Sequence, residues 1–268
     1  WLLKQASLKT RNTPMLDAKK YELIIDNKHP SPNYNQRIST LVLHYTALDL
    51  KTSLQVLTDP KKAVSAHYLV PETSINQERK VYQLVQEDKR AYHAGKSYWQ
   101  GRYNLNDSSI GIEIVNLGYQ DENGKRKWFP FSDYQIMSVI TLSKLIIDRY
   151  QIHPSCIIGH SDIAPNRKVD PGPLFPWQTL YEHGIGAWFD ENEIAISNAT
   201  SNDINILSLQ KDLKIYGYDI ELTGKLDIQT QTILQAFQMH FRPKDYSGKP
   251  DFQTCAILKN LIQKYFSK

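Results

Sequence analysis

The stretch "SDYQIMSVITLSKLIIDRYQI", residues 132–152, has a helical repeat and lies between two runs that are typical of β-strands. Its apolar side chains recur at three- and four-residue spacing, and Ser132 with Gln135 supplies the capping box of a helix start. The run "IGIEIVN" at 110–116 precedes this helix and "CIIGH" at 156–160 follows it, and both are short and rich in isoleucine. A strand, a helix and a strand in succession indicate a domain that mixes the two kinds of element.

Three more strand-like runs lie upstream of this unit, each apolar and bounded by turn-rich sequence. They are "TLVLHYTA" at 40–47, "AHYLV" at 66–70 and "KVYQLV" at 80–85. Together the elements predict an α/β or α+β fold in which a central mixed β-sheet is flanked by helices.

The last third of the chain predicts a separate helical domain. From about 187 to 203 the sequence is acidic and rich in Asn and Ser without a sustained period, which indicates a linker. Three segments of helical period come next: the first stops at Gly217, the second starts after Asp227 and the third starts after Asp251. They predict a small three-helix domain. The predicted division is a catalytic domain at 1–190, with an N-terminal extension to about 35, a linker at 191–203 and the helical domain at 204–268.

The composition excludes several classes of protein. The 32 Lys and Arg against 28 Asp and Glu leave a net charge of +4, and the basic residues are scattered, so we expect no nucleic-acid partner. Cys156 and Cys255 are too few to organise the fold by disulfides. No run approaches the ~20 apolar residues of a membrane span. The chain opens at Trp1 without a basic and apolar leader, so we expect that any export signal or lipid anchor was absent or has been removed.

Two histidines and one aspartate could form a catalytic metal site. His44 interrupts an apolar run, His160 directly follows another, and Asp170 lies in "KVDPG", where Pro171 and Gly172 would rigidify the turn. Two imidazoles and one carboxylate suit Zn²⁺, and three protein ligands leave the fourth tetrahedral position for water. A single histidine is more often a satisfied structural residue, and ligand spacing alone is only moderately specific, so the structural alternative stays open at this point.

Two charged residues could complete hydrolytic chemistry at such a site. Glu113 interrupts an apolar strand and could take a proton from water, and Lys168 could stabilise the negative charge that develops on the substrate. The alternatives are a strand-end glutamate that faces solvent and a solvated loop lysine. Asp162 and Arg167 have no assigned chemistry, and we expect structural hydrogen bonds from both.

The chain resembles a known family over most of its length, from about 20 to 266. The segments "LVLHYTA", "SAHYLV", "RAYHAG", "NDSSIGIEIVN" and "GHSDIAPNRKVDPGPLFPW" resemble the zinc-dependent N-acetylmuramoyl-L-alanine amidases of the AmpD-like family. The segments "YGYDI" and "AFQMHFRPKDYSGKPDFQT" resemble the C-terminal peptidoglycan-binding domain of its AmiD-type members.

The resemblance implies roles for the five residues singled out above. It implies that His44, His160 and Asp170 are the ligands of one zinc ion per chain, that Glu113 is the catalytic glutamate and that Lys168 is the catalytic lysine. The implied reaction is hydrolysis of the amide that joins N-acetylmuramic acid, or its anhydro form, to L-alanine of the stem peptide in peptidoglycan and muropeptides. Peptidoglycan would be the partner of the second domain as well.

The resemblance also implies substrate contacts by Tyr45, His93 and Asn116. The chain departs from the family at Tyr92, where tryptophan is frequent, although an aromatic surface is kept. Aspartate at position 170 separates the chain from the related phage lysozyme and animal recognition-protein amidases, which usually have cysteine there.

The AmiD type further implies a periplasmic enzyme of cell wall degradation in a Gram-negative bacterium, possessing a lipoprotein anchor in the outer membrane. A monomer satisfies every feature of the sequence. The main alternative is a non-catalytic peptidoglycan-binding or recognition protein, although such a receptor has no physical need for all five residues. Zinc hydrolysis of another bond is a second alternative, but a glycosidic bond would require paired carboxylates. A scaffolding protein is the third, and no repeats support it.

Overall fold

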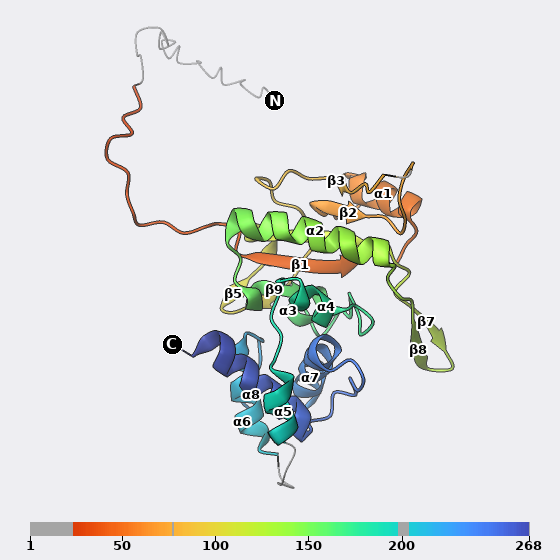
Figure 1. Ribbon diagram of the computed structural model, residues 1–268, viewed down its shortest axis with the longest axis vertical. Coiled ribbons are helices and arrows are strands. Elements are labelled where there is room, and N and C mark those ends of the chain that lie inside the picture. Colours follow the sequence, from red (N-terminus) through yellow and green to blue (C-terminus); the bar gives the residue numbers. More distant parts are fainter. Residues whose placement is uncertain (1–23, 77, 198–203, 268) are drawn as a thin grey trace, which may run out of the picture. The chain divides into compact units, whose positions relative to one another are not determined.

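The computed structural model describes residues 24–76, 78–197 and 204–267 (Figure 1). The chain divides into two compact units, the first ending at Asn35 and the second running from Gln36 to Lys268. Residues 24–35 contain no helix or strand, and the elements below all belong to the second unit. Within the described ranges, no helix is long and apolar enough to cross a membrane.

A five-stranded sheet forms the centre of the second unit. Its order is β3 (Tyr82–Gln83), β2 (Tyr68–Val70), β6 (Ser109–Ile114), β1 (Thr40–Tyr45) and β9 (Ile157–Gly159). The last four are parallel to their neighbours, whereas β3 pairs antiparallel with β2. Each strand overlaps one of the five runs predicted as strands, so the predicted mixed central sheet is confirmed.

The sheet is buried on both faces at its middle. Leu41, Val42 and Leu43 of β1 are all fully buried, and successive residues of a strand point to opposite faces, so packed elements must cover both. Helix α2 (Asp133–Tyr150) runs across the sheet in Figure 1 and buries apolar side chains such as Val139. Its predicted capping box is present at the first turn.

Shorter elements connect the strands and carry the loops of the site. They are α1 (Leu50–Thr58), the hairpins β4 (Tyr98–Trp99) with β5 (Arg102–Tyr103) and β7 (Tyr119–Glu122) with β8 (Lys125–Trp128), the 3-10 helices η2 (Leu105–Asp107) and η3 (Pro154–Cys156), and the helices α3 (His160–Ile163) and α4 (Trp177–Glu182).

Three helices follow, as predicted: α6 (Ile206–Tyr216), α7 (Ile228–Phe241) and α8 (Phe252–Phe266). Gly217 ends α6 with a positive φ of 145°, which glycine adopts without strain. Asp227 caps α7 by accepting from Thr230 N, and Asp251 caps α8 in the same way. The stop and start signals read from the sequence are therefore confirmed.

The segment predicted as a linker is partly helical. Helix α5 (Glu191–Ser197) lies within it and packs against α8, and Asn260 of α8 accepts from Asp190 N at 2.9 Å and donates to Glu193. A helix of seven residues is too short to show a sustained apolar period, and a helix of this length depends on tertiary contacts such as those with α8. The rest of that segment, 198–203, lies outside the described residues.

The C-terminal helices α6–α8 pack directly against the sheet-containing part. The ring of Trp99 lies 4.9 Å from that of Tyr218 and 5.9 Å from that of Tyr216, and Gln100 N donates to Gly217 O at 3.0 Å. The predicted domain boundaries near 190 and 204 stay a prediction, because both lie inside a single compact unit.

Candidate active site

The topology brings the three predicted metal ligands to one edge of the sheet. His44 lies near the carboxyl end of β1, and His160 directly follows β9, the parallel neighbour of β1. Asp170 lies in the loop after α3, and Ser161 N donates to its carbonyl at 2.8 Å. Ligand-binding side chains gather at the carboxyl ends of parallel strands because loops converge there.

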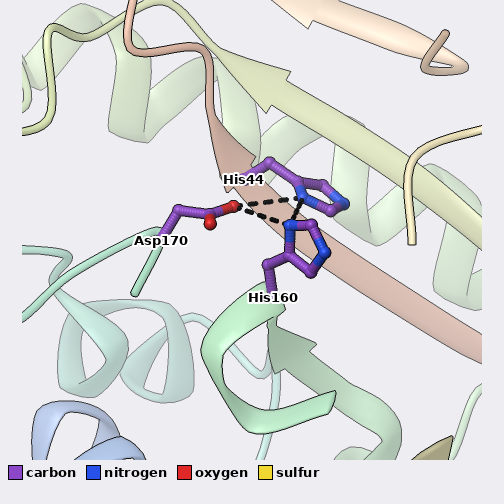
Figure 2. A group of neighbouring side chains, drawn as sticks. All are labelled: His44, His160 and Asp170. Atoms are coloured by element: carbon purple, nitrogen blue, oxygen red, sulfur yellow. Dashed lines mark hydrogen bonds and ion pairs between the residues drawn. The ribbon is translucent and has the colours of Figure 1, made fainter. Parts of the chain in front are cut away.

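The side chains of His44, His160 and Asp170 point toward one another (Figure 2). Nδ1 of His44 lies 2.9 Å from Nδ1 of His160 and 3.2 Å from Oδ2 of Asp170, and the distance from His160 Nδ1 to that oxygen is 3.1 Å. In a tetrahedral site with metal–ligand bonds of about 2.0–2.1 Å, two ligand atoms are about 3.3 Å apart. The donor set and its spacing therefore fit a metal ion, and the group could hold one.

Burial sets the protonation of this group. It lowers the pKa of His44 to about 4, with a further contribution from His160, so the ring is neutral near pH 7. Burial opposes ionisation of Asp170, but the adjacent histidines outweigh it and hold the pKa of this carboxyl well below its ordinary value. A neutral His44 ring and an ionised Asp170 carboxylate are the forms in which these two side chains bind a metal ion.

A chain of hydrogen bonds fixes the tautomer of His44. The hydroxyl of Ser109 donates to Leu105 O at 2.5 Å and therefore accepts from Nε2 of His93 at 3.1 Å. Nδ1 of His93 is then unprotonated and accepts from Nε2 of His44 at 3.0 Å. This order leaves Nδ1 of His44 with a free lone pair, directed at the side chains of His160 and Asp170.

His160 is oriented by the backbone on its other side. Its Nε2 lies 3.3 Å from Ala94 O, which can accept the ring proton and leave Nδ1 free for a metal. The guanidinium of Arg167 donates to the same carbonyl and, at 2.7 and 3.1 Å, to Lys96 O. The expected structural hydrogen bonds of Arg167 are thus confirmed.

Glu113 lies beside the candidate metal ligands, and one of its carboxylate oxygens has no hydrogen-bond partner among the described residues. In the pairing of β1 with β6 it stands opposite His44, and the unpartnered oxygen, Oε2, is buried. Burial raises the pKa of the Glu113 carboxyl well above its ordinary value, Asp170 raises it further, and Lys168 opposes the shift. A buried, unpartnered carboxyl with a raised pKa is suited to accept and return a proton.

A cavity of about 650 Å³ opens onto this group, and Glu113, Lys168, Asp170 and Tyr45 are among its lining residues. This volume is in the range of small-molecule sites. Burial raises the pKa of the Tyr45 hydroxyl, which therefore stays protonated and able to donate. The structure thus brings Lys168 and Tyr45 to the same cavity as the candidate ligands.

The other two residues predicted to contact substrate lie differently. His93 lines the cavity, but its two ring nitrogens are hydrogen-bonded to His44 and Ser109. Asn116 donates to Pro130 O at 2.9 Å and accepts from Gly118 N at 2.7 Å, and it is not among the residues that line the cavity. A substrate contact by Asn116 stays a prediction.

Sequence reasoning missed several supporting residues. Nothing in the strand "SIGIEI" marked Ser109 as the acceptor behind His93. Asp162 was expected to make structural hydrogen bonds, which is confirmed, but its partners Tyr218 and His240 were not anticipated. Both lie in the C-terminal helical region, and no local pattern connects them to the site.

With this geometry in place, comparison with known proteins identifies the family. A family model described as N-acetylmuramoyl-L-alanine amidase matches residues 34–173. The N-acetylmuramoyl-L-alanine amidase AmiD of Escherichia coli strain K12 is 44% identical over 248 residues, covering 90% of this chain and 88% of the relative. The chain belongs to the N-acetylmuramoyl-L-alanine amidase family. A second family model, a putative peptidoglycan binding domain, matches residues 202–258.

Solved structures agree with the fold. The E. coli AmiD complex with anhydro-N-acetylmuramic acid-L-Ala-D-gamma-Glu-L-Lys aligns with a TM-score of 0.85 and 43% identity, over 93% of this chain and 97% of the other. AmpDh3 of Pseudomonas aeruginosa, in complex with anhydromuramic pentapeptide, aligns at 0.81 and 41% identity, over 91% and 99%. The predicted resemblance, fold and muramoyl-L-alanine amidase activity are confirmed, which favours the enzyme over the non-catalytic receptor.

Proposed function

We propose that this amidase uses one zinc ion, held by His44, His160 and Asp170, to hydrolyse the amide between N-acetylmuramic acid, or its anhydro form, and L-alanine. The convergence of their three ligand atoms at 2.9–3.2 Å carries the proposal. Two histidines and one carboxylate are a catalytic type of zinc set, because they leave a coordination position open. Bound there, zinc would supply Lewis acidity toward the scissile carbonyl and would acidify water.

Glu113 and Lys168 carry the proton and charge steps in this proposal. Glu113 takes the proton of the attacking water and delivers it to the departing nitrogen of L-alanine, so one carboxyl serves as base and then as acid. Lys168 faces the same cavity and stabilises the oxyanion that develops on the carbonyl. Tyr45 donates to the substrate from the cavity wall, and His93 acts on His44 rather than on substrate.

Incubation with purified muropeptides tests the proposal. The metal-replete protein should release free stem peptide that begins at L-alanine, identified by mass spectrometry, and chelation should abolish the release. Re-addition of Zn²⁺ should restore it. Binding of muropeptides by the metal-loaded protein without any release would contradict the proposal.

The ligand and base roles separate in two variants. His160→Ala should lose both zinc and activity, because it removes a ligand. Glu113→Ala should retain close to one zinc per chain by atomic absorption and yet lose turnover. A normal turnover rate in Glu113→Ala would remove this residue from the mechanism.

We also propose that the C-terminal helices hold peptidoglycan near the catalytic cavity and so raise the effective substrate concentration. The match to a putative peptidoglycan binding domain supports this role. Since the substrate is cell-wall material, we place the enzyme in the periplasm of a Gram-negative bacterium, with outer-membrane anchoring as the AmiD-type resemblance implies, and as a monomer. Cell fractionation and sedimentation analysis test location and oligomeric state.

A further inference from the structure

A buried carboxylate joins the metal-binding segment to the C-terminal helical region. Asp162 lies on α3, two residues after His160, and its side chain is 1% exposed. Its Oδ2 accepts from Gly159 N and from Nδ1 of His240, both at 2.9 Å, and its Oδ1 accepts from the Tyr218 hydroxyl at 2.6 Å. Donors from three separate segments of the chain therefore meet on one side chain.

Helix α3 depends on contacts from outside itself. It has four residues, and its turn is closed by the bond from Ala164 N to His160 O at 3.0 Å. A single helical turn is unstable alone, because several dihedrals are fixed for one hydrogen bond. Nevertheless, α3 presents His160, and Ser161 N on it holds the carbonyl of Asp170 at 2.8 Å. Misplacement of α3 would therefore move two of the three candidate ligands.

The two side-chain donors to Asp162 are rigidly packed. The ring of His240 stacks on Trp177 at 3.8 Å and on Phe241 at 4.0 Å between centroids. Tyr218 is 1% exposed and lies edge-on to Trp99 at 4.9 Å. Because packing has already removed their rotamer freedom, both donors can hold Asp162 in one position at little further entropic cost.

We propose that Tyr218 and His240 are positioning residues of the metal site, which hold His160 through Asp162 in the orientation that faces His44. The C-terminal helical region is thereby a structural support of the metal site in addition to a peptidoglycan-binding element. This inference rests on the ligand set of the proposed function, but its test measures metal binding without substrate. Outer-shell partners of metal ligands commonly contribute 10–100-fold to metal affinity.

A matched pair of tyrosine variants of the full chain tests the proposal. Tyr216 is also buried in the same region and lies beside Trp99, but in the described structure its hydroxyl makes no hydrogen bond to Asp162. Competition with a chromophoric chelator should show Zn²⁺ affinity about tenfold weaker in Tyr218→Phe, the low end for outer-shell partners. Tyr216→Phe should match the unmodified chain.

Two histidine variants separate hydrogen bonding from packing. His240→Asn retains a donor near the position of Nδ1, whereas His240→Phe retains the stacked ring without a donor. We expect His240→Asn to keep the higher Zn²⁺ affinity. The visible spectrum of the Co²⁺-substituted protein gives a second readout, because its d–d bands report ligand geometry and should change in Tyr218→Phe but not in Tyr216→Phe.

Thermal unfolding of each variant provides the control for general damage. Unchanged Zn²⁺ affinity and an unchanged Co²⁺ spectrum in Tyr218→Phe would overturn the proposal. Equal losses in Tyr218→Phe and Tyr216→Phe would also overturn it, because they would trace the effect to destabilisation of the whole region. Tight Zn²⁺ binding by the unmodified chain without amide hydrolysis would instead count against the proposed function and leave the positioning role standing.

Discussion

His44 and His160 present the same ring nitrogen to the same point, but different kinds of structure hold them. His44 lies in β1, which pairs with β6 on one side and β9 on the other, so sheet hydrogen bonds fix its backbone. His160 lies on the four-residue helix α3. Asp162 of the same helix is hydrogen-bonded to Tyr218 and His240, which lie 56 and 78 positions further along the chain. One candidate ligand thus lies within the sheet, and the other lies on a short helix that is hydrogen-bonded to a distant region of the chain.

The largest expected effect is on the catalytic rate and comes from Glu113, which lies opposite His44 in the sheet. Glu113→Gln keeps the side-chain volume next to His44 but removes the base, so kcat should fall by about 10²–10⁴-fold. Zinc stoichiometry should stay near one per chain, because the sheet and not Glu113 places the ligand. Steady-state kinetics on a muropeptide, together with atomic absorption, measure both. Loss of zinc in this variant would show that the sheet alone does not secure His44.

The pH dependence of folding sharpens the comparison for the metal-free protein. Burial lowers the pKa of His44 from its ordinary 6.5 to about 4, so between these values the unfolded chain binds more protons than the folded one. The free energy of unfolding should therefore fall as pH drops from about 6.5 to about 4, by about 3 kcal/mol from this residue. Thermal unfolding of the chelated protein should show this slope, and His44→Gln should flatten it. Identical slopes would contradict the assignment.

In the loop that follows α3, Lys168→Met should lower kcat about 10²-fold, as removal of an oxyanion donor does. Its Zn²⁺ affinity should be unchanged, because Lys168 faces the cavity without being a ligand. Chelator competition and single-turnover kinetics separate the two effects. A normal kcat would show that Lys168 has no catalytic role and is a solvated loop residue.

The smallest effect should come from the contact between the rings of His93 and His44, and it should appear in the Zn²⁺ affinity. A Cβ at Gly111 would lie 2.4 Å from Cγ of the His93 ring, so Gly111→Ala should displace that ring from His44 and weaken Zn²⁺ binding about tenfold. The same substitution in a His93→Ala background should cost little more, because the clash is gone. Additive losses in the double variant would mean that Gly111 acts by another route.

The sequence was sufficient to predict the features encoded by local pattern. The strand–helix–strand unit around 132–152 follows from apolar periodicity. The placement of His44 and His160 at one edge of the sheet follows from their lying in or directly after strand-like runs. The bonds of Asp162 to Tyr218 and His240 could not be predicted, because they depend on how distant segments pack. Helix α5 escaped prediction for the same reason, since α8 and not its own periodicity stabilises it.

The turn of hairpin β4–β5 limits how this protein could be recombined with others. Gln100 donates to Gly217 O through its backbone and to Tyr216 O through its side chain, so two hydrogen bonds join the turn to the end of α6. A Cβ at Gly217 would lie 2.8 Å from the Gln100 side chain, which leaves no room for another residue in this contact. A chimera that exchanged the C-terminal helices for those of a relative would therefore need a matching hairpin, because the two have to be inherited together.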